Sequence, residues 1–298
     1  MALSYQHEFH AGNFADLQKH LALTLMLSSF CKKEKPFTVI DTHAGAGRFF
    51  LNDARLEKTE EAKAGIKKLM AFYEDPAIPM SCGLKKYLSI EKPYFDKNLY
   101  AGSPEIERIF LREKDKIFLV EKHPQAFKNL EENLKLQIES AEGKKNCLSR
   151  PSVYQEDSYK ALNFLTPPLI KRGFIICDPS YEDLSDYQQV AKSLSQAHKK
   201  WNTASILLWY PLLTHKKNET EQMLSSLEDF AKIGNMPVET LRVEMIVKNP
   251  NELEEDSSSS EKKSRFYGSG IFVMNPPWKF QEELEEGTRQ IQKLLSLI

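Results

Sequence analysis

The chain has 298 residues, a net charge of −1 and 41% hydrophobic residues, so it can bury a sizeable core without disulfide bonds. Its cysteines (Cys31, Cys82, Cys147 and Cys177) are scattered and form no C-x-x-C pair. This pattern favours free thiols in a cytoplasmic protein and argues against structural zinc. Because the net charge is close to zero, any surface for nucleic acid must be a local patch.

Strand-like and helix-like patterns alternate along the chain, as in a doubly wound α/β domain. We predict one domain over residues 1–298, with strands near 37–41, 116–121, 151–155, 173–178, 204–210, 241–247 and 270–275. The charged, proline-punctuated stretch over 51–100 predicts a small helical insertion. The acidic and serine-rich tract over 251–265 predicts a mobile loop, in which Lys262 and Lys263 are candidate phosphate contacts.

The amino-terminal segment is dense in polar and aromatic residues, among them Tyr5, His7, Lys19 and His20. Its histidines do not have the H-E-x-x-H spacing of a metal site, so we predict no metal. A helix is expected to begin at Lys19 and His20. Its apolar body, residues 21–30, is too short to span a bilayer, so we predict a buried helix and no membrane partner.

A glycine-containing turn follows the first strand. Asp41 is succeeded by Gly45 and Gly47, and glycines at such a strand-to-helix turn let a ligand approach the backbone. With no third glycine and no phosphate-loop lysine, nucleotide phosphates are disfavoured, and S-adenosylmethionine fits better. Glu121 ends the next strand and is placed to bind ribose hydroxyls. The long segment between these two strands is explained by the predicted insertion.

The tetrapeptide Asp178-Pro179-Ser180-Tyr181 ends an apolar run and is the strongest chemical signal. An amine conjugated to a ring is a poor nucleophile. Two acceptors, the Asp178 carboxylate and the Pro179 carbonyl, can bind its N–H groups and stabilise the positive charge that develops on methylation. Tyr181 offers a ring on which a base can stack. The sequence therefore predicts methylation of an exocyclic amine.

A second tetrapeptide, Asn275-Pro276-Pro277-Trp278, also follows an apolar run and matches an amino-methylating loop by its letters. In a sheet whose last strand is antiparallel, the end of that strand lies opposite the edge at which ligands bind. We therefore favour Asp178 as the catalytic position and interpret the second tetrapeptide as a structural turn.

Five motifs occur in this order: Tyr5-x-His7-x-Phe9-His10-Ala11-Gly12-Asn13-x-x-Asp16-x-x-Lys19-His20, Asp41-Thr42-His43-Ala44-Gly45-Ala46-Gly47-Arg48, Ala101-Gly102-Ser103-Pro104, Leu208-Trp209-Tyr210-Pro211 and Asn275-Pro276-Pro277-Trp278-Lys279. Together they closely resemble the bacterial 23S ribosomal RNA adenine-N6 methyltransferase family, RlmJ. The resemblance implies a monomeric class I methyltransferase with a Rossmann-like α/β fold, a seven-stranded sheet whose last strand is antiparallel, and a helical insertion.

The resemblance also implies a substrate and a set of site residues. The substrate would be one adenosine of protein-free or early-assembly 23S ribosomal RNA, and the cofactor S-adenosylmethionine would leave as S-adenosylhomocysteine. The predicted catalytic residues are Asp178, Pro179 and Tyr181. The predicted cofactor-binding residues are His20, His43, Gly45, Gly47, Ser103, Glu121, Asp157, Ser158 and Asp178. The predicted RNA-binding residues are Tyr5, His7, Lys19 and Tyr181.

Two residues depart from the family pattern. Ser180 stands where the family has a second proline, which releases a backbone restraint, and Ser158 stands where a glycine is usual. The acceptor chemistry alone also fits methylation of adenine in DNA or of a glutamine amide in a protein. A catalytically weak RNA-binding protein is a further alternative, and Ser180 is the feature that favours it.

Overall fold

A computed structural model describes residues 11–52, 61–135, 150–233, 237–251 and 265–297. The strands are β1 (Thr38–Asp41), β2 (Arg48–Phe50), β3 (Leu99–Ala101), β4 (Lys116–Val120), β5 (Ser152–Tyr154), β6 (Gly173–Cys177), β7 (Ser205–Leu213), β8 (Thr240–Ile246) and β9 (Phe266–Met274). The main helices are α1 (Phe14–Cys31), α3 (Lys68–Tyr73), α4 (Cys82–Phe95), α5 (Ser103–Phe110), α6 (Pro124–Lys135), α7 (Ser158–Leu165), α8 (Leu184–Lys200), α9 (Lys217–Lys232) and α11 (Phe280–Ser296). Tyr5, His7, Lys262, Lys263 and most of the predicted 251–265 loop lie outside the described residues.

Seven strands form one sheet in the order β5-β4-β1-β6-β7-β9-β8. The first five of these are parallel to one another, whereas β9 runs antiparallel to both β7 and β8. The predicted seven-stranded sheet with an antiparallel last strand is therefore confirmed. The central strand β6 is buried along its whole length, as expected for a parallel strand covered on both faces.

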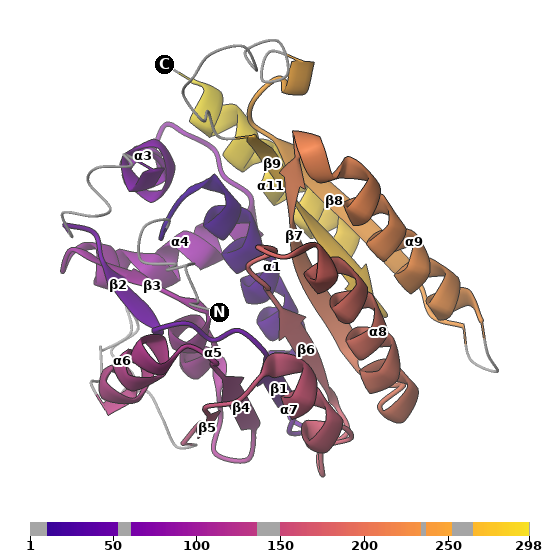
Figure 1. The fold of residues 1–298 in the computed structure, drawn as a ribbon. Coiled ribbons are helices and arrows are strands. Elements are labelled where there is room, and N and C mark those ends of the chain that lie inside the picture. The colour runs from indigo at the N-terminus through magenta and orange to yellow at the C-terminus, as the bar shows by residue number, and fades with distance from the viewer. Residues whose placement is uncertain (1–10, 53–60, 136–149, 234–236, 252–264, 298) are drawn as a thin grey trace.

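Helices pack on both faces of the sheet (Figure 1). Successive residues of β6 point to opposite layers because side chains alternate along a strand. Phe174 and Ile176 join a core with α1, α4, α5 and α11, and Ile175 and Cys177 join a core with α7, α8 and α9. This arrangement leaves the carboxyl ends of the parallel strands free to form a site.

The helix α1 begins at Phe14, five residues before the predicted start at Lys19. The reason is the cap: Asn13 Oδ1 accepts hydrogen bonds from the backbone N–H groups of Ala15 and Asp16, both at 3.0 Å, and such caps fix a helix start. The helix is buried from Ala15 to Leu27, as predicted. None of the helices in the described ranges combines the length and the apolar character that crossing a membrane requires.

Between β2 and β3 lie a short π-helix (Lys63–Lys67), α3 and α4, all within the predicted insertion over 51–100. The helix α4 packs against α1, and α3 packs against α11. The two strands that flank the insertion were not predicted; they pair antiparallel, with Arg48 opposite Ala101. This small ladder joins the start of the insertion to its end.

Two strands are longer than predicted. β7 continues through Pro211 to Leu213, and β9 begins at Phe266. Proline has no N–H to donate and usually ends a strand. Here the antiparallel pairing places Pro211 opposite Ser269 and continues with a register shift between Leu212 and Leu213, so the ladder extends past the proline.

Candidate active site

A pocket of about 310 Å³ opens at the carboxyl ends of the parallel strands, the edge at which α/β sheets bind ligands. Ten predicted site residues line it: Lys19, His20, His43, Gly45, Ser103, Glu121, Asp157, Ser158, Asp178 and Pro179. Gly47 and Tyr181 are described but do not line the pocket. The structure thus gathers side chains from four strand ends and from α1 around one cavity.

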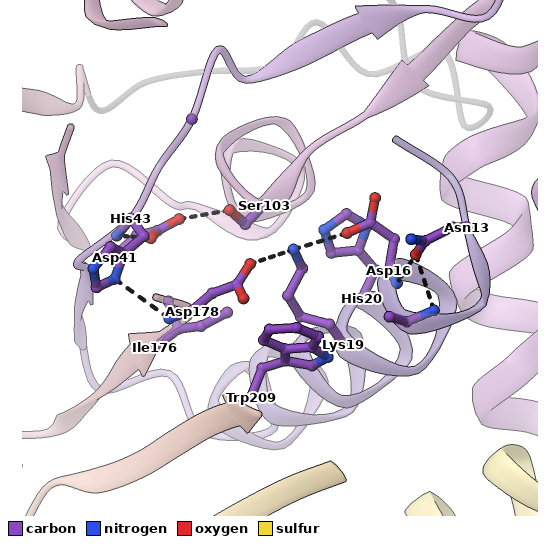
Figure 2. A network of polar contacts seen from close by, with 12 residues as sticks. Asn13, Asp16, Lys19, His20, Asp41, His43, Ser103, Ile176, Asp178 and Trp209 are labelled. Carbon is purple, nitrogen blue, oxygen red and sulfur yellow. Dashed lines mark hydrogen bonds and ion pairs between the residues drawn. The ribbon is translucent and has the colours of Figure 1, made fainter. Parts of the chain in front are cut away.

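Asp41 ends β1 beneath this pocket and organises the turn that follows. Its Oδ2 accepts a hydrogen bond from Ser103 Oγ at 2.6 Å, and its Oδ1 accepts one from the His43 backbone N–H at 3.0 Å (Figure 2). Burial raises the Asp41 pKa to about 6, although the Ser103 hydrogen bond opposes this shift. Asp41 therefore holds Ser103, at the start of α5, next to the glycine turn.

The two glycines of the turn have backbone angles that favour glycine, with φ of 61° at Gly45 and 81° at Gly47. The Gly45 N–H donates to Glu121 Oε2 at 2.8 Å. The Gly47 carbonyl accepts from the Gly102 N–H at 2.8 Å. Gly45 thus lines the pocket, whereas Gly47 connects the turn to the segment that precedes α5.

Carboxylates at the ends of β4 and β5 occupy the next part of the lining. Glu121 Oε1 accepts from the His123 N–H at 2.7 Å, and burial raises the Glu121 pKa above its ordinary value. Asp157 caps α7 and pairs with Lys122 Nζ at 3.0 Å. Burial alone would raise the Asp157 pKa, but the Lys122 hydrogen bond and the α7 backbone N–H groups lower it overall. Within the described residues, no three His, Cys, Asp or Glu side chains gather as metal ligands.

The amino-terminal helix α1 reaches the loop that follows β6, residues 178–181, through an ion-pair relay (Figure 2). Lys19 Nζ lies 2.5 Å from Asp178 Oδ2 and 2.9 Å from Asp16 Oδ1, and Asp16 Oδ2 accepts the Gly12 N–H at 2.9 Å. Burial alone would lower the Lys19 pKa, but the charges of Asp16 and Asp178 raise it above its ordinary value. Lys19, predicted to contact RNA, is thus a buried cation that holds Asp178.

Two histidines flank this relay and differ in their surroundings. His20 Nδ1 lies 2.7 Å from the Tyr100 hydroxyl, which is 3.2 Å from the Tyr87 hydroxyl. Burial lowers the His43 pKa to about 4, so His43 is neutral at physiological pH. Its Nδ1 accepts the Asp178 backbone N–H at 3.4 Å. His43 therefore helps to fix the start of the 178–181 loop.

Tyr181 lies where its ring cannot meet a ligand in the pocket. It is 2% exposed and its φ is 53°. Its hydroxyl donates to the Trp209 carbonyl at 3.0 Å, and its ring packs 4.8 Å from the ring of Tyr187. The predicted stacking role of Tyr181 stays a prediction, and it requires the ring to leave this position.

The competing tetrapeptide lies at the other edge of the sheet. Met274, which ends β9, pairs with Ile206 and Thr240 near the amino ends of β7 and β8. Asn275 Nδ2 donates to the carbonyls of Thr203 and Ala204, both at 3.3 Å. As the topology predicted, this loop is remote from the pocket.

Comparisons with known proteins show which family the chain resembles. The sequence model of the family described as "Ribosomal RNA large subunit methyltransferase D, RlmJ" matches residues 34–296. Ribosomal RNA large subunit methyltransferase J of Escherichia coli K12 is 33% identical over 286 residues, which cover 95% of this chain and 90% of that protein. Its namesake in Haemophilus influenzae is 31% identical, with 98% and 94% covered.

A solved structure is also similar. Protein LPL1258 from Legionella pneumophila has a TM-score of 0.76 and 28% identity, with 96% of this chain and 94% of that chain covered. The predicted class I methyltransferase fold is confirmed by the sheet order and by this similarity. Together with the family match, these findings show that the chain belongs to the RlmJ family of ribosomal RNA large subunit methyltransferases.

Proposed function

We propose that this protein transfers a methyl group from S-adenosylmethionine to N6 of one adenosine in 23S ribosomal RNA. The observation that carries the proposal is the position of Asp178, whose carboxylate lines the same pocket as Gly45 and Glu121. An acceptor for an amine and the residues expected to hold the cofactor thus share one cavity. Membership in the RlmJ family supports ribosomal RNA as the substrate.

The charge of the pocket fits the cofactor. The lining has six carboxylates (Glu121, Asp157, Asp178, Glu182, Asp183 and Asp186) against two lysines, Lys19 and Lys122. S-adenosylmethionine carries a sulfonium and an ammonium group, so an acidic lining favours it over a phosphate-bearing cofactor. Bound there, the cofactor supplies an electrophilic methyl group. The Glu121 carboxylate would accept hydrogen bonds from ribose hydroxyls, and Ser103, His20 and the Gly45 turn would hold the amino-acid end.

Asp178 acts on the amine of the base. Its Oδ2 is bound to Lys19, and its side chain is 17% exposed, which leaves Oδ1 to accept an N–H from the substrate. The Pro179 carbonyl is the second acceptor. A carboxylate is too weak a base to deprotonate a neutral aminopurine. Its role is to orient the amine and to stabilise the positive charge that develops during transfer.

Lys19 positions this acceptor. Because the ammonium group lies between two carboxylates and is buried, it restricts the rotamer of Asp178. An adenine inside a helix or loop must swing out of its stack to reach such a pocket. Tyr5 and His7 are proposed RNA contacts from the sequence. We also propose that the protein acts as a monomer in the cytoplasm, on protein-free or early-assembly RNA.

Radiolabelled methyl transfer to protein-free 23S ribosomal RNA, followed by nucleoside analysis, tests the function. We expect N6-methyladenosine as the product. Asp178→Ala should lower kcat about 10²- to 10³-fold, as does the loss of one transition-state hydrogen-bonding group elsewhere. The matched control is Asn275→Ala, in the competing tetrapeptide, which should keep full kcat. An active Asp178→Ala with an inactive Asn275→Ala would reverse the assignment of the catalytic loop.

A further inference from the structure

Five segments meet at the edge of the sheet opposite the pocket, and we call them the amino-edge surface. They are residues 32–37, 111–116, 166–172, 199–204 and 275–279, which lead into β1, β4, β6 and β7 or follow β9. Because β9 is antiparallel to β7, the Asn275 loop comes to the same edge as the other four segments.

Side chains bind these segments into one surface. Arg112 Nη1 donates to the Lys33 carbonyl at 2.9 Å, and Arg172 Nη1 donates to the Lys35 carbonyl at 2.6 Å. Trp201 Nε1 and Thr203 Oγ1 both donate to the Lys171 carbonyl, at 2.6 and 3.0 Å. The bond from Asn275 to Thr203 completes the chain of contacts. Backbone carbonyls accept these bonds, so the lysine ammonium groups remain at the surface.

The amino-edge surface is strongly basic. Its five segments contain eleven Lys and Arg residues and three acidic residues, whereas the whole chain has a net charge of −1. Among its exposed ammonium groups are those of Lys32, Lys33, Lys114, Lys171, Lys199 and Lys279. The neighbouring segment that leads into β8 adds one charge of each sign, Lys232 and Glu239. A local excess of this size attracts a polyanion.

An exposed aromatic ring lies in the same surface. Trp278 is 82% exposed and stands next to Lys279. An indole face in this position can stack with an unpaired base, and such stacking is typical of single-stranded nucleic-acid sites. Leu169, in the 166–172 segment, is also fully exposed, at 103%. Basic side chains around an apolar and aromatic surface fit RNA better than an acidic protein.

The pocket itself does not attract phosphates. Its described lining has six carboxylates and two lysines, so the attraction that dominates nucleic-acid affinity must come from another surface. We propose that the amino-edge surface is a second RNA-binding surface. Its lysines bind phosphates of a ribosomal RNA segment distant from the target adenosine, and Trp278 stacks with an unpaired base of that segment. The inference rests on the proposed function.

The position of the amino-edge surface predicts that long and short RNA substrates respond differently to its mutation. The two surfaces lie at opposite edges of the sheet, about 17 Å apart along the five residues of β6, and helices cover both faces between them. A short, straight hairpin seated in the pocket therefore does not contact the amino-edge surface. A long RNA that folds around the protein does. The surface should therefore affect KM for 23S ribosomal RNA and leave KM for a minimal hairpin unchanged.

The test compares two fourfold charge reversals. One carries Lys32→Glu, Lys33→Glu, Lys171→Glu and Lys199→Glu on the amino-edge surface. The matched control carries Lys85→Glu, Lys97→Glu, Lys192→Glu and Lys293→Glu, which are exposed lysines on α4, after α4, on α8 and on α11. Both variants change the net charge by the same amount, so a general electrostatic effect would appear in both.

Methyl transfer to protein-free 23S ribosomal RNA and to a hairpin of about 20 nucleotides around the modified adenosine is measured with each protein. We expect the amino-edge variant to raise KM for 23S RNA at least about tenfold with unchanged kcat, and to reduce the salt slope of binding by about 3 to 4. Trp278→Ala should raise KM about 5- to 150-fold. The hairpin and the control variant should show changes of less than about twofold.

Equal KM values and equal salt slopes for the amino-edge and control variants on 23S RNA would overturn the inference. So would an equal loss of activity on hairpin and 23S RNA by the amino-edge variant. Failure of the wild-type protein to methylate either RNA would instead contradict the proposed function, so the two failures are distinguishable.

Discussion

Removing the buried cation at Lys19 is the most direct test of the ion-pair relay between α1 and the 178–181 loop. The side chains of Lys19, Asp16 and Asp178 are 7%, 3% and 17% exposed, so Lys19→Met would leave two largely buried carboxylates without their shared partner. Breaking a buried pair in this way costs about 3–5 kcal/mol. The Lys19 pKa is raised in the folded state, so its contribution is fully present at pH 7 and is lost only as pH rises above the ordinary lysine range.

Urea unfolding at pH 7 measures this cost. Asp178→Asn added to Lys19→Met should recover part of the lost stability, because the second substitution removes one unpaired charge. Lys122→Met is the matched control: its partner is Asp157 and its side chain is 59% exposed, so it should cost at most about 1 kcal/mol. A Lys19→Met protein with the stability of the wild type would refute the reasoning, as would an equal cost for both lysines.

Three further predictions concern the pocket. Burial raises the pKa of Asp41 to about 6, so between about pH 4 and pH 6 the folded state keeps a proton that the unfolded state has lost. The stability of the wild type relative to Asp41→Asn should therefore fall by roughly 3 kcal/mol as pH rises from about 4 to 6. A stability difference that does not change with pH in urea titrations would contradict this. Gly47→Ala should destabilise the fold by about 1–2 kcal/mol, because φ at this position is 81° and the added Cβ would lie 3.0 Å from Leu130 Cδ1. An unchanged thermal unfolding temperature would contradict this prediction. Ser180→Pro, at an exposed position in the pocket lining, should leave kcat equal or higher, and a large loss would show that the serine has a role of its own.

The fold was predictable where local pattern and tertiary structure agree. The buried apolar run before Asp178 and the β-branched run before Asp41 both form parallel strands, and each of the seven predicted strands overlaps a strand of the sheet. The β2–β3 pair was not predicted, because each strand has only three residues and Arg48 and Ala101 pair across the whole insertion. Such pairing leaves no periodicity in the sequence.

The site was predictable to a similar degree. Strand-end residues such as Glu121 and Asp178 come together because parallel strands end at one edge. The ion pair between Lys19 and Asp178 joins residues 159 positions apart, and no local spacing reports it. Lys19 was predicted to contact RNA, and nothing in its sequence neighbourhood indicated that its side chain is buried against Asp178. The burial of Tyr181 beside Trp209 could not be predicted either, because a residue type does not reveal which way its side chain points.

The relative position of the cofactor and Asp178 is the centre of this account. A crystal structure of the protein with S-adenosylhomocysteine measures it directly. We expect the ribose at Glu121 and the sulfur directed toward the Asp178 carboxylate, with Lys19 still bound to that carboxylate. A cofactor bound outside this pocket, or a sulfur atom that points away from Asp178, would contradict the proposed mechanism.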